Sequence, residues 1–125
     1  MSSRSVGKPL SGINEIGLIP IIVTEHSITT PGTLIHKSSI SSDDYVWVWA
    51  ANTHTQAVTI TVYKGSTSEG FDVDNIMTLQ PRDNKILIEP GILLKEGLEI
   101  RIVASVSEVV KASGFVHRRT EGDFI

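Results

Sequence analysis

The sequence predicts an all-β protein, a jelly-roll-like antiparallel β-sandwich of about eight strands with an extended N-terminal arm. Two observations lead to this fold class. Short runs rich in β-branched residues recur at intervals of roughly 8–12 residues, with turn-forming residues between them. Within several runs apolar and polar side chains alternate, as they do on a strand that buries one face. Many short strands at this spacing are typical of a sandwich or a small barrel.

The expected strands are, in chain order, 18–27, 33–37, 45–51, 57–63, 75–79, 85–88, 98–104 and 109–118. Turn residues separate them at Thr30–Gly32, Ser41–Asp44, Gly65–Gly70, Pro81–Asn84, Pro90–Gly91 and Glu96–Gly97. Pro fixes φ for a turn, Gly supplies positive φ, and Asp or Asn bonds to its own backbone. Residues 92–96 would give barely one helical turn, so no helix is expected.

Two pairs of neighbouring strands are interpreted as hairpins. The first runs from Tyr45 to Tyr63 and places Tyr45, Trp47 and Trp49 on one face of its leading strand. The second covers 98–118. Its leading strand has an inward row of Leu98, Ile100, Ile102 and Ala104, with Glu99 and Arg101 facing outward. Its return strand has Lys111, Ser113, Phe115 and His117 on one face. Packing of such apolar rows between sheets would drive folding, at about 1.5–3 kcal/mol for each large side chain buried.

The domain boundaries follow from composition. Residues 1–15 are rich in Ser, Gly and Lys and are interpreted as a flexible or partner-ordered arm, 16–118 as the sandwich, and 119–125 as a C-terminal tail. A segment this polar buries too little apolar surface to order alone. Deleting it should therefore leave the sandwich folded. The candidate interface residues are Val6, Pro9, Leu10 and Ile13 in the arm, Trp47 and Trp49 on the strand, and Phe124 and Ile125 at the end.

Composition excludes several classes of function. The net charge is −3, which argues against a nucleic-acid partner because such proteins present a basic surface. The chain contains no cysteine, so disulfides and thiolate metal sites are impossible. The apolar run 16–23 is too short to span a membrane, and the start lacks the apolar core of a secretory signal. We expect a protein made in the cytoplasm, with no membrane partner.

No catalytic motif is present, so we expect no enzyme activity and no cofactor. The histidines are His26, His36, His54 and His117. None forms a short-range ligand motif, and the pair that could still meet in space is His36 and His117. A metal there would indicate a cupin-like enzyme. Asp72 and Asp74 are spaced like calcium ligands on a loop, although a solvated turn is the simpler interpretation. Asp43-Asp44 is a second acidic pair, and Arg118-Arg119 is interpreted as a salt-bridge partner at a rim.

Trp47 and Trp49 have two interpretations. Both lie on the same face of one strand, where they could form an exposed platform for sugars, bases or another protein. Alternatively, both lie in the core or under a loop. The sequence favours this second interpretation, since few other aromatic residues accompany them to form a broad platform.

Two segments carry a family resemblance. The run VWVWAANTHTQAVTITVYKG, and later NKILIEPGILLKEGLEIRIVAS, resemble patterns in small structural proteins of tailed bacteriophages. These include head decoration (cement) proteins and neck or tail components. The resemblance implies a non-enzymatic virion protein whose partners are the major capsid protein or other virion subunits. A homo-oligomer is expected, for which a trimer is one closed form. The alternatives are a neck, tail or fibre component, or a carbohydrate-binding module that uses Trp47 and Trp49.

Overall fold

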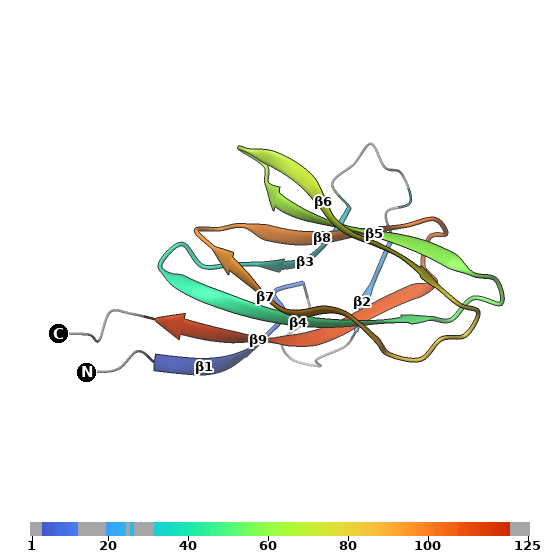
Figure 1. Cartoon of the computed structure of the whole chain (residues 1–125), viewed down its shortest axis with the longest axis horizontal. Helices are drawn as coiled ribbons and strands as arrows, with labels where there is room; N and C mark the ends of the chain where they lie inside the picture. Colours follow the sequence, from blue (N-terminus) through green and yellow to red (C-terminus); the bar gives the residue numbers. More distant parts are fainter. Residues whose placement is uncertain (1–3, 13–19, 25, 27–31, 121–125) are drawn as a thin grey trace.

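The computed structural model describes residues 4–12, 20–24, 26 and 32–120, which form two antiparallel sheets (Figure 1). The first sheet has the order β1 (Arg4–Pro9), β9 (Val110–Thr120), β4 (Ser42–Asn52) and β7 (Ile86–Lys95), and β2 (Ile21–Ile22) also pairs with β9. The second has the order β3 (Thr33–Lys37), β8 (Glu99–Ala104), β5 (Val58–Ser66) and β6 (Gly70–Leu79). The all-β sandwich is therefore confirmed. None of the described residues belongs to a helix that could cross a membrane.

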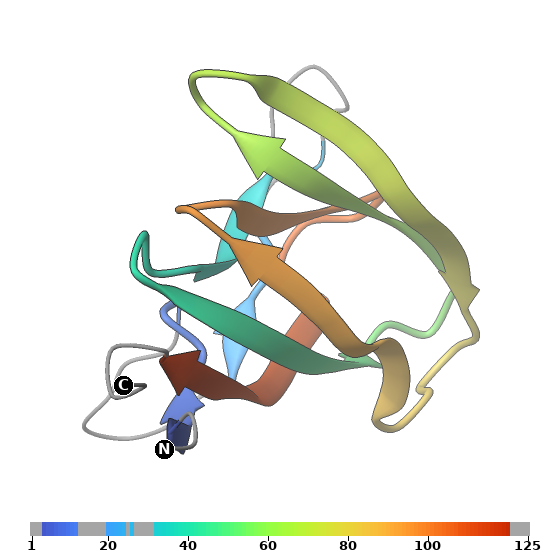
Figure 2. The same cartoon turned by 60° about the vertical axis from the view of Figure 1, so that its left-hand side comes forward.

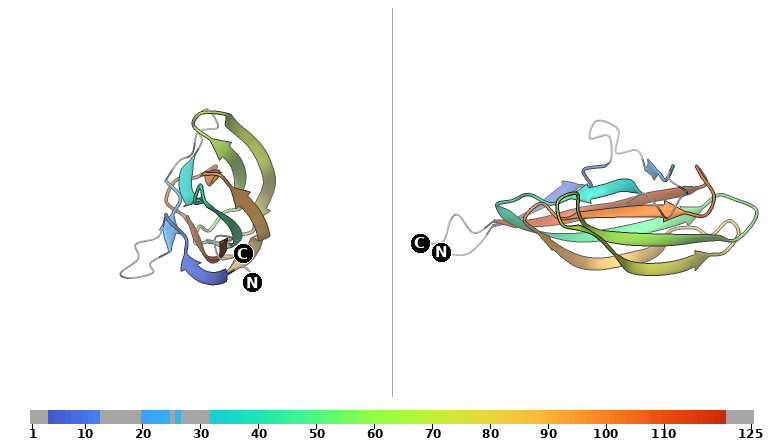
Figure 3. Two further views of the ribbon diagram at one scale, coloured as in Figure 1. Left: turned by 90° about the vertical axis from the view of Figure 1, so that its left-hand side faces the viewer. Right: turned by 90° about the horizontal axis from the view of Figure 1, so that it is seen from above.

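The pairing is nested around a single hairpin. β5 pairs with β6, β4 with β7, β3 with β8 and β1 with β9. This long antiparallel ribbon is rolled up, which brings β4 against β9 and β5 against β8. The result is the strand order of a jelly roll, with the two sheets facing each other in the end-on view of Figure 3. Because Arg4 pairs with Thr120, the start of β1 and the end of β9 lie at the same end of the sandwich.

The core lies between the sheets and is built from the inward rows of the central strands. Val46, Val48 and Ala50 of β4 are fully buried, and they alternate with the half-buried outward row. The facing sheet contributes inward rows from β5 and β8, namely Val58, Ile60, Val62, Ile100, Ile102 and Ala104. Because buried and outward residues alternate along each of these strands, the residues between the core positions form the outer surface of the sheet.

The two predicted hairpins are wrong, although their strands exist. β4 and β5 belong to different sheets, as do β8 and β9. In a rolled ribbon most consecutive strands cross from one sheet to the other, and among the strands of the described residues only β5 and β6 pair as chain neighbours. Glu99 lies on the outer side of β8 as predicted, since the neighbouring Ile100 is in the core, but it is not exposed. Glu99 is buried, because Arg101 lies against it with Nε donating to Oε1 at 2.6 Å.

The predicted turn at Pro90–Gly91 is also wrong, because both residues lie inside β7. The β4–β7 register shifts twice, and Gly91 is the unpaired extra residue in one of these shifts. Its φ is +84°, the left-handed conformation that a glycine type of β-bulge requires. The turn-forming residues Pro90 and Gly91 therefore lie at a bulge in the edge strand β7.

Part of the predicted arm packs on the chain itself. Arg4–Pro9 form β1 and extend the first sheet along β9, and Leu10 is fully buried in the core. Gly12 N donates to Ile35 O at 3.0 Å. Leu10 is therefore unavailable as an interface residue, which corrects the prediction. The remaining predicted contacts Ile13, Phe124 and Ile125 lie outside the described residues, and the structure describes only the backbone of Val6.

Candidate functional site: an aromatic sheet face

The outer surface of the first sheet carries a continuous group of aromatic and apolar side chains. Strand register places Phe115 of β9 and Pro90 of β7 on either side of Trp47, and Leu87 beside Trp49. Pro9 of β1 lies on the far side of Phe115. We call this surface the aromatic face. It comprises Pro9, Tyr45, Trp47, Trp49, Leu87, Pro90, Leu93 and Phe115, all exposed or half-buried. Figure 2 shows β9, β4 and β7 side by side in this sheet.

Trp47 is held in place from both neighbouring strands. Its ring stacks on Phe115, with centroids 5.1 Å apart and planes inclined by 14°. On the other side lies Gly91, where an added Cβ would meet Cζ2 of the indole at 2.9 Å. Phe115 also contacts Trp49, with centroids 5.9 Å apart. Neighbours therefore occupy both sides of the indole, and Trp47, Phe115 and Trp49 form one packed ridge.

The favoured core position of Trp47 and Trp49 is therefore wrong. The core side of β4 is formed by the alternate residues Val46 and Val48, which are fully buried. Sequence reasoning also missed Phe115 as a partner, although it is 46% exposed and contacts both tryptophans. The available signal was the alternation in 109–118, which places Phe115 on one face with Lys111, Ser113 and His117. That row was paired with 98–104 by chain order, whereas β9 in fact lies beside β4.

Charged residues border the aromatic face at both ends. Asp43 lies between Arg119 and Lys95 in the register, and Lys95 Nζ is 3.8 Å from Asp43 Oδ1. Lys111 lies at the opposite end, beside the exposed Ile22. The outward positions of β4, β7 and β9 thus contain three cationic side chains and one carboxylate. An apolar centre with a charged rim is the usual composition of a protein interface.

A second polar group lies inside the sandwich, around Asp44. His36 Nε2 is 2.7 Å from Asp44 Oδ2, and Arg118 donates to both carboxylate oxygens at 2.8 and 3.0 Å. The backbone N–H of Ser11 donates to His36 Nδ1 at 3.0 Å. Nδ1 therefore carries no proton, and His36 is the neutral tautomer that donates from Nε2. This cluster connects β3 to β4, β9 and the segment after β1.

The pKa directions agree with this bonding. Burial lowers the pKa of His36 below its ordinary 6.5, and the hydrogen bond with Asp44 opposes that shift only in part. Burial alone would raise the pKa of Asp44, but hydrogen bonds from Arg118 and His36 outweigh it and lower the pKa. Arg118 is thus an internal ion-pair partner, bidentate to a fully buried carboxylate. The predicted salt-bridge role of Arg118 is therefore confirmed, although its partner is a buried carboxylate; its own side chain is 27% exposed.

The structure does not bring the predicted metal ligands together. His36 is buried between the sheets, whereas His117 lies exposed on the outer surface opposite Tyr45. Within the described ranges, no group of three or more His, Asp or Glu side chains could hold a metal ion. Asp43 and Asp44 point to opposite sides of β4, as their burial alternates.

The predicted pair Asp72 and Asp74 is separated by a register shift in β6. Asp72 lies opposite Lys64, and Asp74 reaches Glu89 of β7. Glu89 is buried, and its Oε2 has no hydrogen-bond partner. Burial and the bond to Asp74 raise the pKa of Glu89 to about 8. Glu89 and Asp74 lie where β6 and β7, the edge strands of the two sheets, meet, and there Asn75 Nδ2 also donates to Ile88 O at 3.3 Å.

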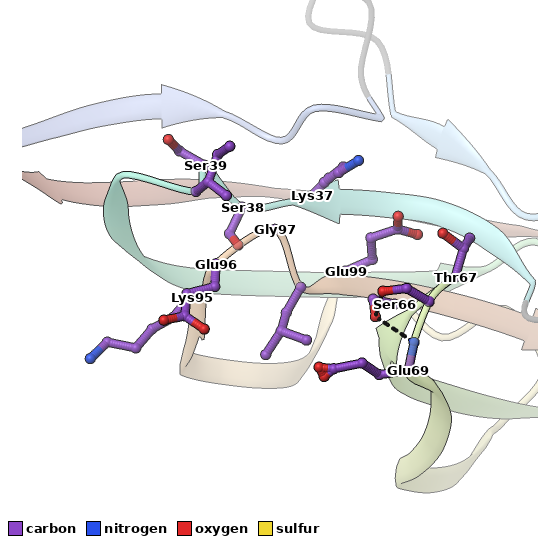
Figure 4. A pocket seen from close by; sticks show the side chains of 13 residues that line it. Lys37, Ser38, Ser39, Ser66, Thr67, Glu69, Lys95, Glu96, Gly97 and Glu99 are labelled. Atoms are coloured by element: carbon purple, nitrogen blue, oxygen red, sulfur yellow. Dashed lines mark hydrogen bonds between the residues drawn. The ribbon is translucent and has the colours of Figure 1, made fainter.

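A groove of about 760 Å³ lies at one end of the sandwich, between the β3–β4, β5–β6 and β7–β8 connections (Figure 4). Its lining contains several serine hydroxyls, two lysines and three glutamates. Ser38 is buried there, and its Oγ has no hydrogen-bond partner. The mixture of both charges with hydroxyls favours no single class of ligand. The aromatic face is therefore the stronger candidate site.

Comparisons of the chain with protein-family models, with curated proteins and with solved structures found no match.

Proposed function

We propose that this chain is a non-enzymatic structural protein of a virion, most specifically a capsid cement (decoration) protein that stabilises the head through subunit contacts. The sequence resemblance to small phage structural proteins supplies the virion context. The jelly roll is compatible with it but does not select it, because the same fold serves capsid proteins, lectins and cupins. A neck, tail or fibre component of the particle is the alternative within the same class.

The aromatic face is the observation that carries the proposal. Tryptophan, tyrosine and phenylalanine are enriched at the centres of protein interfaces, where they contribute most of the binding energy. Phe115 and Leu87 are more than 40% exposed here and lie beside Trp47 and Trp49. A contiguous exposed apolar patch marks an interaction site, and the sheet beneath it is a fixed support. Burying this face against capsid subunits would strengthen the shell.

Internal bonding of His36 supports a structural role for the polar cluster. Both ring nitrogens are engaged, Nδ1 by the Ser11 N–H and Nε2 by Asp44. A general acid or base must reach a substrate atom, and both nitrogens of this buried imidazole are already bonded to groups of its own chain. The hydrogen bond from His36 of β3 to Asp44 of β4 connects the two sheets.

A carbohydrate-binding module remains the second candidate, because Trp47, Trp49 and Phe115 are all accessible on one face. Sugar rings stack on open aromatic faces, whereas Trp47 has Phe115 and Gly91 against it. The packed ridge thus favours a protein partner. Titration of tryptophan fluorescence with a panel of oligosaccharides distinguishes the two, since a saturable change would favour the lectin function.

The direct experiment is to purify the particles and to measure whether the protein is present and at what copy number. A copy number comparable to that of the major capsid protein is expected for cement. A single ring of copies would place it at the neck or tail, and absence from particles would refute the proposal. When the protein is removed from purified heads and the Phe115→Asp variant is added back, the variant should bind to the heads more weakly than the intact chain does. Ile40→Asp is the matched control, since Ile40 is exposed but lies outside the aromatic face.

A further inference from the structure

We propose that the aromatic face binds the β5–β6 hairpin of a second copy of this chain, so that copies associate head to tail. The proposal rests on the proposed function in one respect, namely that the aromatic face is a contact surface. It adds the identity of the occupant. Two independent properties of the hairpin, its charge and its exposed apolar residues, match the aromatic face.

The first match is electrostatic. The hairpin of β5 and β6 carries three carboxylates, Glu69, Asp72 and Asp74, and a single lysine, Lys64. The outward positions of β4, β7 and β9 have the opposite balance, with Lys95, Lys111 and Arg119 against Asp43. Potentials of opposite sign steer association and fix orientation. The acidic hairpin therefore fits the basic rim of the aromatic face.

The second match is apolar. Val73 is 51% and Ile76 is 63% exposed, and strand register places them opposite Tyr63 and Thr61 on the outer side of the second sheet. β6 is the edge strand of its sheet, and Figures 1 and 2 both show the turn of this hairpin at the margin of the sandwich. It can therefore approach a neighbouring molecule without displacing other strands. Its aliphatic side chains can cover the aromatic ridge, where burial of apolar area is favourable.

The charges oppose a face-to-face arrangement. A two-fold contact brings the same surface of both copies together. Two aromatic faces would then place an excess of lysine and arginine against the same excess, and like charges across an interface are unfavourable. The contact between face and hairpin joins two different surfaces instead. Such heterologous contacts generate closed rings when the rotation closes, and a trimer is the smallest ring.

The test uses the full chain and two variants, one for each surface. Phe115→Asp places a carboxylate in the aromatic face, and Val73→Lys replaces an apolar contact of the hairpin by a cation. Light scattering coupled to size exclusion should show an oligomer for the intact chain, and mainly the 13.6 kDa monomer for each variant alone. When the two variants are mixed, each still has one intact surface, and one complementary contact can form. The mixture should therefore give a dimer that grows no further.

Ile40→Lys is the control, because this side chain is 81% exposed and belongs to neither surface. It should leave the oligomer unchanged. Ile76→Lys is a second hairpin variant and should behave as Val73→Lys does. Circular dichroism verifies that every variant is folded. A monomeric intact chain, an oligomer that survives both hairpin variants, or a mixture that remains monomeric would each overturn the proposal. None of these solution outcomes depends on particles, so the cement function is tested separately by copy number.

Discussion

His36 and Asp44 form a buried hydrogen bond of 2.7 Å between β3 of one sheet and β4 of the other. Arg118 completes the charge balance from β9. The two residues are eight positions apart, yet they connect opposite layers of the sandwich. This polar cluster links the two sheets through the core, so its removal should lower the stability of the fold.

Replacing Asp44 by Ala should strongly destabilise the fold. Arg118 and His36 would lose their shared acceptor, and removal of one partner of a buried ion pair typically costs about 3–5 kcal/mol. Asp43→Ala is the matched control. Asp43 is more exposed and pairs with Lys95 at 3.8 Å, so its loss should cost under about 1 kcal/mol. Urea unfolding of both variants measures the difference. Equal effects would show that the internal cluster contributes no more than a surface pair.

Acid should weaken the fold through His36. The folded state keeps this imidazole neutral below its ordinary pKa of 6.5, so the unfolded chain binds more protons just below that pH. The free energy of unfolding must therefore fall as the pH drops below about 6.5. Asp44, whose pKa is also lowered, adds a further loss as the pH falls below 3.8. Urea unfolding at several pH values should show the first loss in the intact chain and not in His36→Asn.

Glu89 should act in the opposite direction. Its pKa is about 8 in the folded protein and 4.5 ordinarily, so between these values the folded state binds more protons. The free energy of unfolding should fall as the pH rises from 4.5 to about 8. Glu89→Gln keeps a neutral side chain and should remove this decline. It should also make the decrease in the free energy of unfolding at acidic pH, which is due to His36, easier to observe.

Glu96→Gln serves as the control for Glu89, since Glu96 lies exposed in a turn. Its pH profile should match that of the intact chain. If the Glu89 variant also keeps the original profile, protonation of Glu89 has no influence on stability.

Gly91→Ala should disturb the aromatic face. Alanine at φ +84° is strained, at a cost on the order of 1–2 kcal/mol, and its Cβ would press on the indole of Trp47. We expect a lower melting temperature and a changed tryptophan fluorescence spectrum. Gly97→Ala is the comparison, because that glycine has φ +80° and no atom within 4 Å of the added Cβ. Only the variant at Gly91 should alter the fluorescence.

Leu10→Ala tests whether the N-terminal segment belongs to the fold. Leu10 is fully buried in the core, and truncation of a buried leucine typically costs about 2–5 kcal/mol. Thermal unfolding should show a clear loss of stability. Lys8→Ala, at an exposed position two residues earlier, should change little. An unaffected Leu10 variant would restore the interpretation of residues 1–15 as a dispensable arm.

The strands were predictable because their signal is local. Alternation from Tyr45 to Ala51 places the strand well, and the structure extends it to Ser42–Asn52. The pairing was not predictable, since it depends on residues far apart in the chain. Phe115 meets Trp47 only because β9 lies beside β4. Likewise, Pro90 and Gly91 have the composition of a turn, and only the partner strand shows that they form a bulge.

The candidate site was predicted in part. Trp47 and Trp49 were identified as one face of a strand, which the register confirms. Whether that face is inside or outside depends on which side the second sheet covers, and alternating rows of comparable apolarity do not decide this. The Asp44 cluster was missed for a related reason. His36 and Arg118 lie 82 positions apart, and their common contact with Asp44 exists only after the ribbon is rolled.

The nested pairing also constrains how the chain acquires its structure. Within the part of the chain that the structure describes, β5 and β6 are the only consecutive strands that pair directly, so their hairpin is the natural place for ordering to begin. Each later pair closes a longer loop, and closure of β1 on β9 must wait for the last strand to be synthesised. Topologies dominated by such distant contacts fold in milliseconds to seconds. During that interval the hydrophobic rows are unprotected, so we expect aggregation during refolding to increase steeply with protein concentration.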